Sequence, residues 1–172
     1  MRFLALDFET AGLKPSEHAP VTLAVVLMQT NDKDASVIES REWLFGDQSK
    51  HEKSHMRRDY NIGALKISGT SFEQIENDGM TPADVYSELT QFLQSHNASG
   101  LTVVSHNAVF DQGFMDDLLF RLGSWERAWN CHAPARSPFF GSWACTKRMF
   151  SNMNPGQPAT LDHALSTYGL SR

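Results

Sequence analysis

The chain has 172 residues, enough for one domain of ordinary size, and we expect a single domain over residues 1–172. Hydrophobic residues make up 41% and charged residues 20%, a globular composition that excludes a wholly disordered chain. The net charge of −5 excludes a basic protein that holds polyanions by bulk attraction alone. An acidic protein can still act on nucleic acid, provided that bound cations supply positive charge locally.

The sequence also bears on membrane contact and on the redox compartment. Its longest purely apolar run, Leu23–Met28, has six residues, far fewer than the ~20 that a membrane helix needs. The N-terminal segment reaches Asp7 too early to hold the apolar core of a secretory signal. Two cysteines, Cys131 and Cys145, are too few for a disulfide framework. We therefore expect a reduced, cytoplasmic protein without membrane contact.

The first sixty residues predict three strands. The apolar run Phe3–Leu6 ends abruptly in Asp7–Thr10, which predicts a central strand, buried on both faces, whose carboxyl end reaches a site. Val21–Thr30 and Val37–Phe45 predict two more strands, and their short connections favour an antiparallel meander. The polar, mixed-charge stretch Gly46–Tyr60 predicts a surface loop.

The rest of the chain alternates predicted helices with strands. Thr81 and Pro82 open a helix as N-cap and first helical residue, a strand follows at Leu101–Ser105, and a further helix begins near Asn107. That helix is expected to stop at Gly123. Three more segments are predicted: a long loop over Ser124–Gly141, a strand running into a helix over Trp143–Phe150, and a helix over Thr160–Tyr168. The order predicts an α/β domain with a mixed five-stranded sheet, three strands antiparallel and two parallel, and helices on both faces.

Two carboxylates stand at the end of the first predicted strand. Asp7 and Glu9 are two residues apart, so their side chains point to the same face, roughly 7 Å apart. Two anions at the end of a buried strand repel each other and lose hydration, which is costly unless a cation or tight hydrogen bonding compensates. The alternative is that Glu9 is exposed beyond the strand end and Asp7 only caps the loop.

A third carboxylate, Asp111, lies on the apolar stripe of the helix that follows Asn107. It precedes Met115 by four residues and Leu118 by seven, the spacing of one helix face. Charged residues are rarely fully buried unless they are paired or bind a metal. The alternative for Asp111 is a salt bridge to a lysine or arginine elsewhere. By contrast, Asp117 and its neighbour Asp116 predict an ordinary solvated face with some contact to Arg121.

The three acidic residues together indicate a site for divalent cations. Hard oxygen ligands without clustered cysteines favour Mg²⁺ or Mn²⁺ over zinc. Several carboxylates at a strand end suit a two-metal site, whose natural substrate is a phosphodiester. Such ions would also attract the phosphate that an acidic protein would otherwise repel.

Two stretches resemble the motifs of one enzyme family. Asp7–Leu13 reads D-F-E-T-A-G-L, and Ser105–Asp111 reads S-H-N-A-V-F-D. The first resembles the D-x-E-T-x-G-L motif and the second the H-N-x-x-F-D motif of the DEDD-type 3′–5′ exonucleases, the DnaQ-like group that includes RNase T and oligoribonuclease. Ile75–Leu93 looks like the family's helix before the second motif, and Ala159–Leu170 looks like its T-L…G-[IL] segment. The resemblance runs through most of the chain.

The resemblance implies an RNase H-like fold and a metal-dependent 3′–5′ exonuclease that hydrolyses single-stranded DNA or RNA from its 3′-end. It assigns catalytic and metal-binding roles, with two Mg²⁺ or Mn²⁺ ions, to Asp7, Glu9 and Asp111. It implies a substrate-binding role for five further residues. Three of them would hold the terminal nucleotide and two would shape the turn and the substrate groove: Thr10, Gly12 and Leu13, and then His106 and Asn107. A homodimer is a further possibility, since several family members pair.

The family's third motif, H-x-x-x-x-D or Y-x-x-x-D, has no match. It supplies the general base and the fourth carboxylate, but only Ser171–Arg172 follow the T-L…G-[IL] segment. His163 does not fit, because the residue five positions on is Tyr168. No base is therefore assigned, and we expect a domain shortened at its C-terminus. The alternative is a catalytically incomplete module that binds nucleic-acid ends or a protein partner without cutting.

Overall fold

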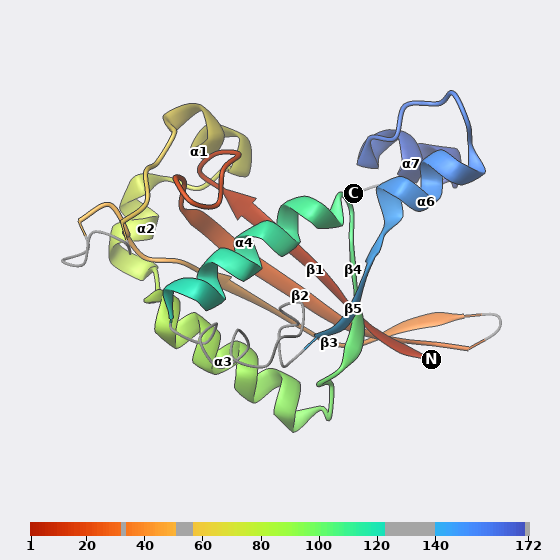
Figure 1. Ribbon diagram of the computed structural model, residues 1–172, viewed down its shortest axis with the longest axis horizontal. Helices are drawn as coiled ribbons and strands as arrows, with labels where there is room; N and C mark the ends of the chain where they lie inside the picture. The colour runs from red at the N-terminus through yellow and green to blue at the C-terminus, as the bar shows by residue number, and fades with distance from the viewer. Residues whose placement is uncertain (32–33, 51–56, 123–139, 171–172) are drawn as a thin grey trace.

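The computed structural model describes residues 1–31, 34–50, 57–122 and 140–170 of the chain (Figure 1). Its centre is a five-stranded sheet with the strand order β3-β2-β1-β4-β5. The elements, in chain order, are β1 (Arg2–Thr10), β2 (Pro20–Thr30), β3 (Ala35–Leu44), α1 (Ile62–Ser68), α2 (Phe72–Asp78), α3 (Pro82–Ser95), β4 (Leu101–Ser105), α4 (Ala108–Arg121), β5 (Phe140–Cys145), α6 (Thr146–Met153) and α7 (Leu161–Thr167). The predicted α/β fold is confirmed.

The strand pairing shows which edge of the sheet can carry a functional site. β1 pairs antiparallel with β2, and β2 with β3, whereas β4 runs parallel to β1 and β5 parallel to β4. Three antiparallel strands thus join two parallel ones, as predicted. Ala5 is opposite Val104, and Ser105 is opposite Cys145. The carboxyl ends of β1, β4 and β5 therefore meet at one edge, the usual place for a site in a sheet with parallel strands.

The main core lies between one face of the sheet and the helices α3 and α4. Leu4, Leu6 and Phe8 alternate along β1 and are all buried in this core. The residues between them are half-buried or exposed, because they point to the opposite face. β1 is therefore buried on one face, and the prediction that it is buried on both is wrong. In Figure 1, α4 crosses in front of the sheet.

The two long helices begin where the sequence predicts. Thr81 caps α3, its hydroxyl accepting a hydrogen bond from the Asp84 amide at 3.2 Å, and Pro82 is the first helical residue. α4 follows Asn107, whose φ of 76° lies in the left-handed region that asparagine tolerates. The predicted stop at Gly123 lies outside the described residues. So does most of the predicted loop over residues 124–141, whose last two residues belong to β5.

The segment between β3 and α3 departs from the predicted surface loop. Gln48 and Arg58 are 1% and 6% exposed, so part of this polar stretch is buried. Two short helices follow, α1 and α2, which the sequence reading missed. Ser71 and Gln74 form a reciprocal capping box at the start of α2. The family-like stretch Ile75–Leu93 is thus two helices, α2 and α3, with Gly79 at the break.

This segment leaves the sheet and returns to it at one point. The Gly46 amide donates to the Met80 carbonyl at 2.7 Å, and the Met80 amide donates to the Leu44 carbonyl at 2.8 Å. The two backbones touch there: a Cβ on Gly79 would lie 2.4 Å from the Gly46 Cα. Only glycine fits such a close crossing.

The C-terminal helices pack around one aromatic side chain. Phe150 of α6 is buried, and the rings of His163 and Tyr168 meet it edge-on. The Nε2 atom of His163 lies 3.0 Å from Gln157 Oε1. α7 itself contains no buried residue. Among the described helices, none combines the length and the apolar character needed to span a membrane.

Candidate active site

Asp7 and Glu9 lie at the carboxyl end of β1, where the sequence predicts them. Both side chains are exposed and both point away from the core that buries Phe8 between them. Strand alternation explains this arrangement, because residues two apart share a face. The two carboxylates are therefore open to solvent at the edge where β1, β4 and β5 end.

Asp111 is buried in the first turn of α4, with 2% of its surface exposed. Its Oδ1 atom accepts a hydrogen bond from the Phe8 amide at 3.0 Å, and its Oδ2 atom accepts one from the Ser105 hydroxyl. Both donors are neutral. Among the ion pairs of the described residues, none involves Asp111, so the structure does not support the alternative of a salt bridge. The predicted burial of this carboxylate is confirmed.

The pKa of Asp111 reflects its burial first and the charge of Asp7 to a smaller extent. Burial raises the pKa of Asp111 from 3.8 to about 6. The hydrogen bonds from Ser105 and Phe8 lower this pKa, and the negative charge of Asp7 raises it further. Two carboxylates thus repel each other at the strand edge, an arrangement that a cation would relieve.

The described residues fit a cation site only in part. No three histidine, cysteine, aspartate or glutamate side chains of the described ranges come close enough to hold a metal ion. The pair Asp7 and Asp111 has the hard oxygen donors and the mutual repulsion that suit Mg²⁺ or Mn²⁺. Mg²⁺ often binds through one or two carboxylates together with substrate phosphates, so a pair is enough for one ion. The ligand roles of these residues, Glu9 included, stay predictions.

A pocket of about 650 Å³ lies at the carboxyl end of β1, and Asp7 and Asp111 are not among the residues that line it. Glu9 lines it, together with Thr10, Gly12 and Leu13, the three residues predicted to hold a terminal nucleotide. The Thr10 hydroxyl donates to the Gly12 carbonyl at 2.7 Å and so braces the turn after β1. Pockets of this size are typical of small-molecule sites. The structure thus gathers one predicted ligand and three predicted binding residues around one pocket.

The opposite wall of this pocket was missed by the sequence reading. It comes from α1 and its start, with Asn61, Ala64 and Ile67 among the lining residues. Asn61 is the N-cap of α1, since its Oδ1 atom accepts from the Gly63 amide at 2.8 Å. That capping pattern could have indicated the helix. Nothing in the sequence indicates that the helix faces the turn after β1.

His18 fills the space that Gly12 leaves. A Cβ on Gly12 would lie 2.2–2.7 Å from three atoms of the His18 ring. The Nδ1 atom of His18 lies 3.3 Å from the Lys14 amide, which fixes the ring inside the loop. Both His18 and Gly12 line the pocket. A larger residue at position 12 would therefore displace a part of the pocket wall.

His106 and Asn107 lie in the turn between β4 and α4, as predicted, and are not among the residues that line the pocket. The His106 ring joins this turn to the C-terminal part of the chain: Nδ1 lies 3.0 Å from the Thr146 hydroxyl, and Nε2 lies 3.2 Å from the Ala159 carbonyl. Their predicted contact with substrate stays a prediction. Phe110, by contrast, lines the pocket and also packs against Phe114 of the core, with ring centroids 5.0 Å apart.

Comparison with solved structures gives a consistent result. Exonuclease I of E. coli, in its zinc-bound complex with single-stranded DNA, matches this chain with a TM-score of 0.73 at 17% sequence identity, covering 99% of this chain and 36% of that one. A product-bound exonuclease I gives a TM-score of 0.73 at 16% identity, covering 99% and 39%. The complex of E. coli exonuclease I with a dT13 oligonucleotide gives 0.71 at 16%, covering 99% and 36%.

The chain spans little more than a third of the exonuclease I chains that it matches. No protein-family model matches the sequence, and no curated protein does. An identity of 16–17% establishes a shared fold and nothing finer. The chain thus has the fold of exonuclease I, which confirms, for the fold, the predicted resemblance to the DEDD-type exonucleases.

Proposed function

We propose that this chain is a metal-dependent exonuclease domain that hydrolyses the terminal phosphodiester bond at the 3′-end of a nucleic acid. One observation carries the proposal: Asp111 is buried without a cationic partner in the described ranges, and this burial, with a smaller contribution from the charge of Asp7, raises its pKa. A protein gains nothing in stability from such a pair. Perturbed carboxylates beside a pocket are typical of functional sites.

The proposed cofactor is Mg²⁺ or Mn²⁺, held by Asp7 and Asp111 with Glu9 nearby. Divalent ions at such a site would activate water and neutralise charge on the phosphate. A zinc-bound form of exonuclease I supports the use of a divalent cation. The chain's own contribution is to hold the carboxylates: Ser105 and the Phe8 amide fix Asp111 before substrate arrives. We keep the cytoplasm as the proposed compartment.

The proposed substrate is a single strand, with DNA favoured. The pocket beside Glu9 is lined by Phe110, Leu13 and Ile67, apolar side chains that can contact any base. Leu13 and Ile67 are 80% and 88% exposed, so their side chains are accessible to a base that enters the pocket. Exonuclease I is seen in complex with single-stranded DNA, which supports this choice.

A second candidate is a module that binds nucleic-acid ends without cutting them. Both oxygens of Asp111 already accept hydrogen bonds, and no three-ligand group exists among the described residues. An ion would have to share the Oδ2 atom with the Ser105 hydroxyl, through the second lone pair of that oxygen. A binding module would therefore need only the pocket, not the complete set of ligands.

The test is cleavage of an oligonucleotide labelled at its 5′-end, with Mn²⁺ present. The exonuclease predicts stepwise shortening from the 3′-end, which EDTA stops. Asp7→Asn should abolish this shortening, whereas Asp78→Asn, an exposed carboxylate at the end of α2, should leave it unchanged. Shortening from the 5′-end, or full activity of Asp7→Asn, would contradict the proposal. Metal-assisted binding without product would instead favour the second candidate.

A further inference from the structure

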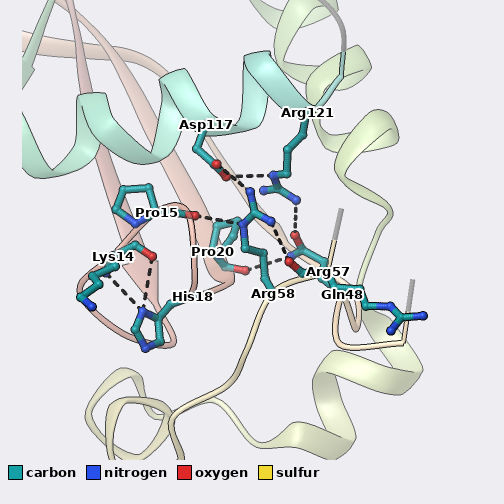
Figure 2. A network of polar contacts seen from close by, with 9 residues as sticks. All are labelled: Lys14, Pro15, His18, Pro20, Gln48, Arg57, Arg58, Asp117 and Arg121. Carbon is teal, nitrogen blue, oxygen red and sulfur yellow. Dashed lines mark hydrogen bonds and ion pairs between the residues drawn. The ribbon is translucent and has the colours of Figure 1, made fainter. Parts of the chain in front are cut away.

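A buried polar cluster lies where the loop after β1 meets α4 (Figure 2). We call residues 11–19 the pocket loop, since Gly12, Leu13, Lys14 and His18 all line the pocket. At the centre of the cluster is Arg58, which is 6% exposed. Its Nε atom donates to the Pro15 carbonyl at 3.0 Å, and its Nη2 atom donates to Asp117 Oδ1 at 2.6 Å. One guanidinium thus bridges the pocket loop and α4.

The cluster holds the end of the pocket loop as well. Asp117 Oδ2 accepts from Arg121 Nε at 2.8 Å, and Arg121 Nη1 donates to Gln48 Oε1 at 2.7 Å. Gln48 Nε2 in turn donates to the carbonyl of Pro20, the first residue of β2, at 3.3 Å. The carbonyls of Pro15, in the middle of the loop, and of Pro20, just past its end, are therefore both linked to the carboxylate of Asp117. Arg58 makes the first link, and Gln48 together with Arg121 makes the second.

Backbone contacts beside Arg58 hold the same loop. The Asp59 amide donates to the Glu17 carbonyl at 2.8 Å, and the Ala19 amide donates to the Asp59 carbonyl at 3.0 Å. These bonds tie the loop to residue 59 but not to α4. The side chain of Arg58 links the middle of the loop to α4, the helix that carries Asp111, whereas Gln48 and Arg121 link only the residue just past its end.

The loop and α4 also touch through Gly113. A Cβ at this position would lie 3.2 Å from Pro15 Cγ, closer than side chains ordinarily pack. Glycine in the middle of a helix is less stable than alanine would be there. Gly113 stands between Asp111 and Asp117 in sequence, and its place in the helix is explained by the loop that lies against it.

The cluster is poorly built for stability alone. Two buried guanidinium groups share the carboxylate of Asp117, and Arg121 Nη2 has no hydrogen-bond partner among the described residues. Burial lowers the pKa of Arg121, because the charged form loses hydration. Buried charges of this kind often cost more than they return in stability. The geometry that they impose is the more direct reason for them.

We propose that Arg58 is a positioning residue, which sets the distance between the pocket loop and the carboxylates by bridging the Pro15 carbonyl and Asp117. This inference rests on the proposed function, because it assigns the pocket to the terminal nucleotide. Without the bridge the loop keeps its backbone bonds to residue 59 and the contact of Gln48 with Pro20, but its middle, at Pro15, loses its hydrogen-bonded link to α4. The terminal nucleotide is then held out of line with the carboxylates.

The test compares Arg58→Gln with Arg57→Gln, which removes the same charge from the adjacent, exposed residue. Two measurements are made on each. The first is the Kd for a 3′-ended dT octamer in Ca²⁺, and the second is Mn²⁺-dependent hydrolysis of bis(p-nitrophenyl) phosphate, which has no nucleoside. Arg58→Gln should raise the Kd about ten-fold and change the second rate less than two-fold. Arg57→Gln should change the Kd less than three-fold, and Arg58→Lys should recover part of the loss.

A second variant separates position from stability. Gly113→Ala adds one methyl group against Pro15 and removes a helical glycine, so it pushes the loop without touching any charge. We expect its melting temperature to be equal to or above that of the wild type and its Kd for the octamer to rise about three-fold. A purely structural role would instead make affinity follow melting temperature across all the variants.

The results distinguish a failure of the inference about Arg58 from a failure of the proposed function. If Arg58→Gln binds the octamer as the wild type does, or loses both activities in proportion to its melting temperature, the inference is wrong and the proposed function stands. If Gly113→Ala leaves the Kd unchanged, the contact with α4 does not set the position of the loop. If the wild type neither binds the octamer nor cuts either substrate, the proposed function itself fails.

Discussion

Two aspartates of α4, Asp111 and Asp117, have opposite surroundings although they lie six residues apart on one helix. Asp117 forms ion pairs with Arg58 at 2.6 Å and with Arg121 at 2.8 Å, so two positive charges compensate its negative charge. Asp111 receives only a backbone amide and a hydroxyl, and its pKa is raised to about 6. A largely buried carboxylate with cationic neighbours fixes the positions of the segments around it, and one without them is available for chemistry.

The largest effect is expected for the uncompensated carboxylate. Asp111→Asn keeps the shape, and its amide can still meet the Phe8 amide and the Ser105 hydroxyl. Cleavage should fall by roughly 10³-fold or more, because a proposed metal ligand is lost. Mn²⁺ should raise the melting temperature of the wild type but not of this variant. An Asp111→Asn protein that still cuts would remove the distinction between the two aspartates.

The compensated carboxylate should matter for folding. Asp117→Asn leaves two buried guanidinium groups without their counterion, which should lower the free energy of unfolding by about 3 kcal/mol. Urea denaturation measures this change. The adjacent Asp116→Asn is the control: burial raises the pKa of Asp116, so removing its charge should cost little. Equal losses in the two variants would show that the arginines do not depend on Asp117.

The third effect is the pH dependence of stability, which we expect from Asp111. The pKa of Asp111 is higher in the folded protein, about 6, than its ordinary 3.8, so the folded state binds the extra proton and the charged form is the costly one. Without metal, the wild type should therefore lose stability relative to Asp111→Asn as the pH rises from about 4 to 6. The difference should level off near roughly 3 kcal/mol. Melting curves of both proteins against pH give the value, and a flat difference would contradict the raised pKa.

The smallest effect is expected at an ion pair of the pocket loop that faces solvent. Lys14 and Glu17 pair at 3.1 Å, with more than half of each side chain exposed. Water and salt screen such pairs, so Glu17→Gln should change the free energy of unfolding by less than about 0.5 kcal/mol. The comparison with Asp117→Asn in the same urea experiment shows how much burial adds to a charge pair. If Glu17→Gln lowered the free energy of unfolding as much as Asp117→Asn does, the contribution of a charge pair would not depend on its exposure.

Periodicity was enough to predict most of the sheet and the burial of Asp111. β4 begins and ends where the sequence predicts, and Asp111 lies on the face that its spacing from Met115 and Leu118 indicates. These features depend on neighbours within one element, which the sequence displays directly. The predicted contact of Arg121 with Asp117 is confirmed for the same reason, because the two are four residues apart.

Features that depend on distant segments were not predictable. Asp117 was expected on a solvated face, and that is wrong, because its second partner, Arg58, comes from a segment 59 residues away. Arg58 itself lies in a polar stretch that looks like a surface loop until its acceptors are known. α1 is only seven residues long and has a single buried residue, Leu65, so its contact with the pocket has no periodic signal.

The backbone crossing at Gly46 and Gly79 has a consequence for how such a protein can change. Residues 46–79 depart from the sheet and rejoin it at the same place, so their length is not dictated by the strands. They supply one wall of the pocket, while the acidic residues stand on β1 and α4. Under the proposed function, exchanging the part of this segment that lines the pocket would alter which terminal groups are accepted, provided that Gln48 and Arg58 keep their contacts with Pro20, Pro15 and α4. Changes in the sequence or length of this segment could therefore broaden or narrow the range of substrates that the domain accepts.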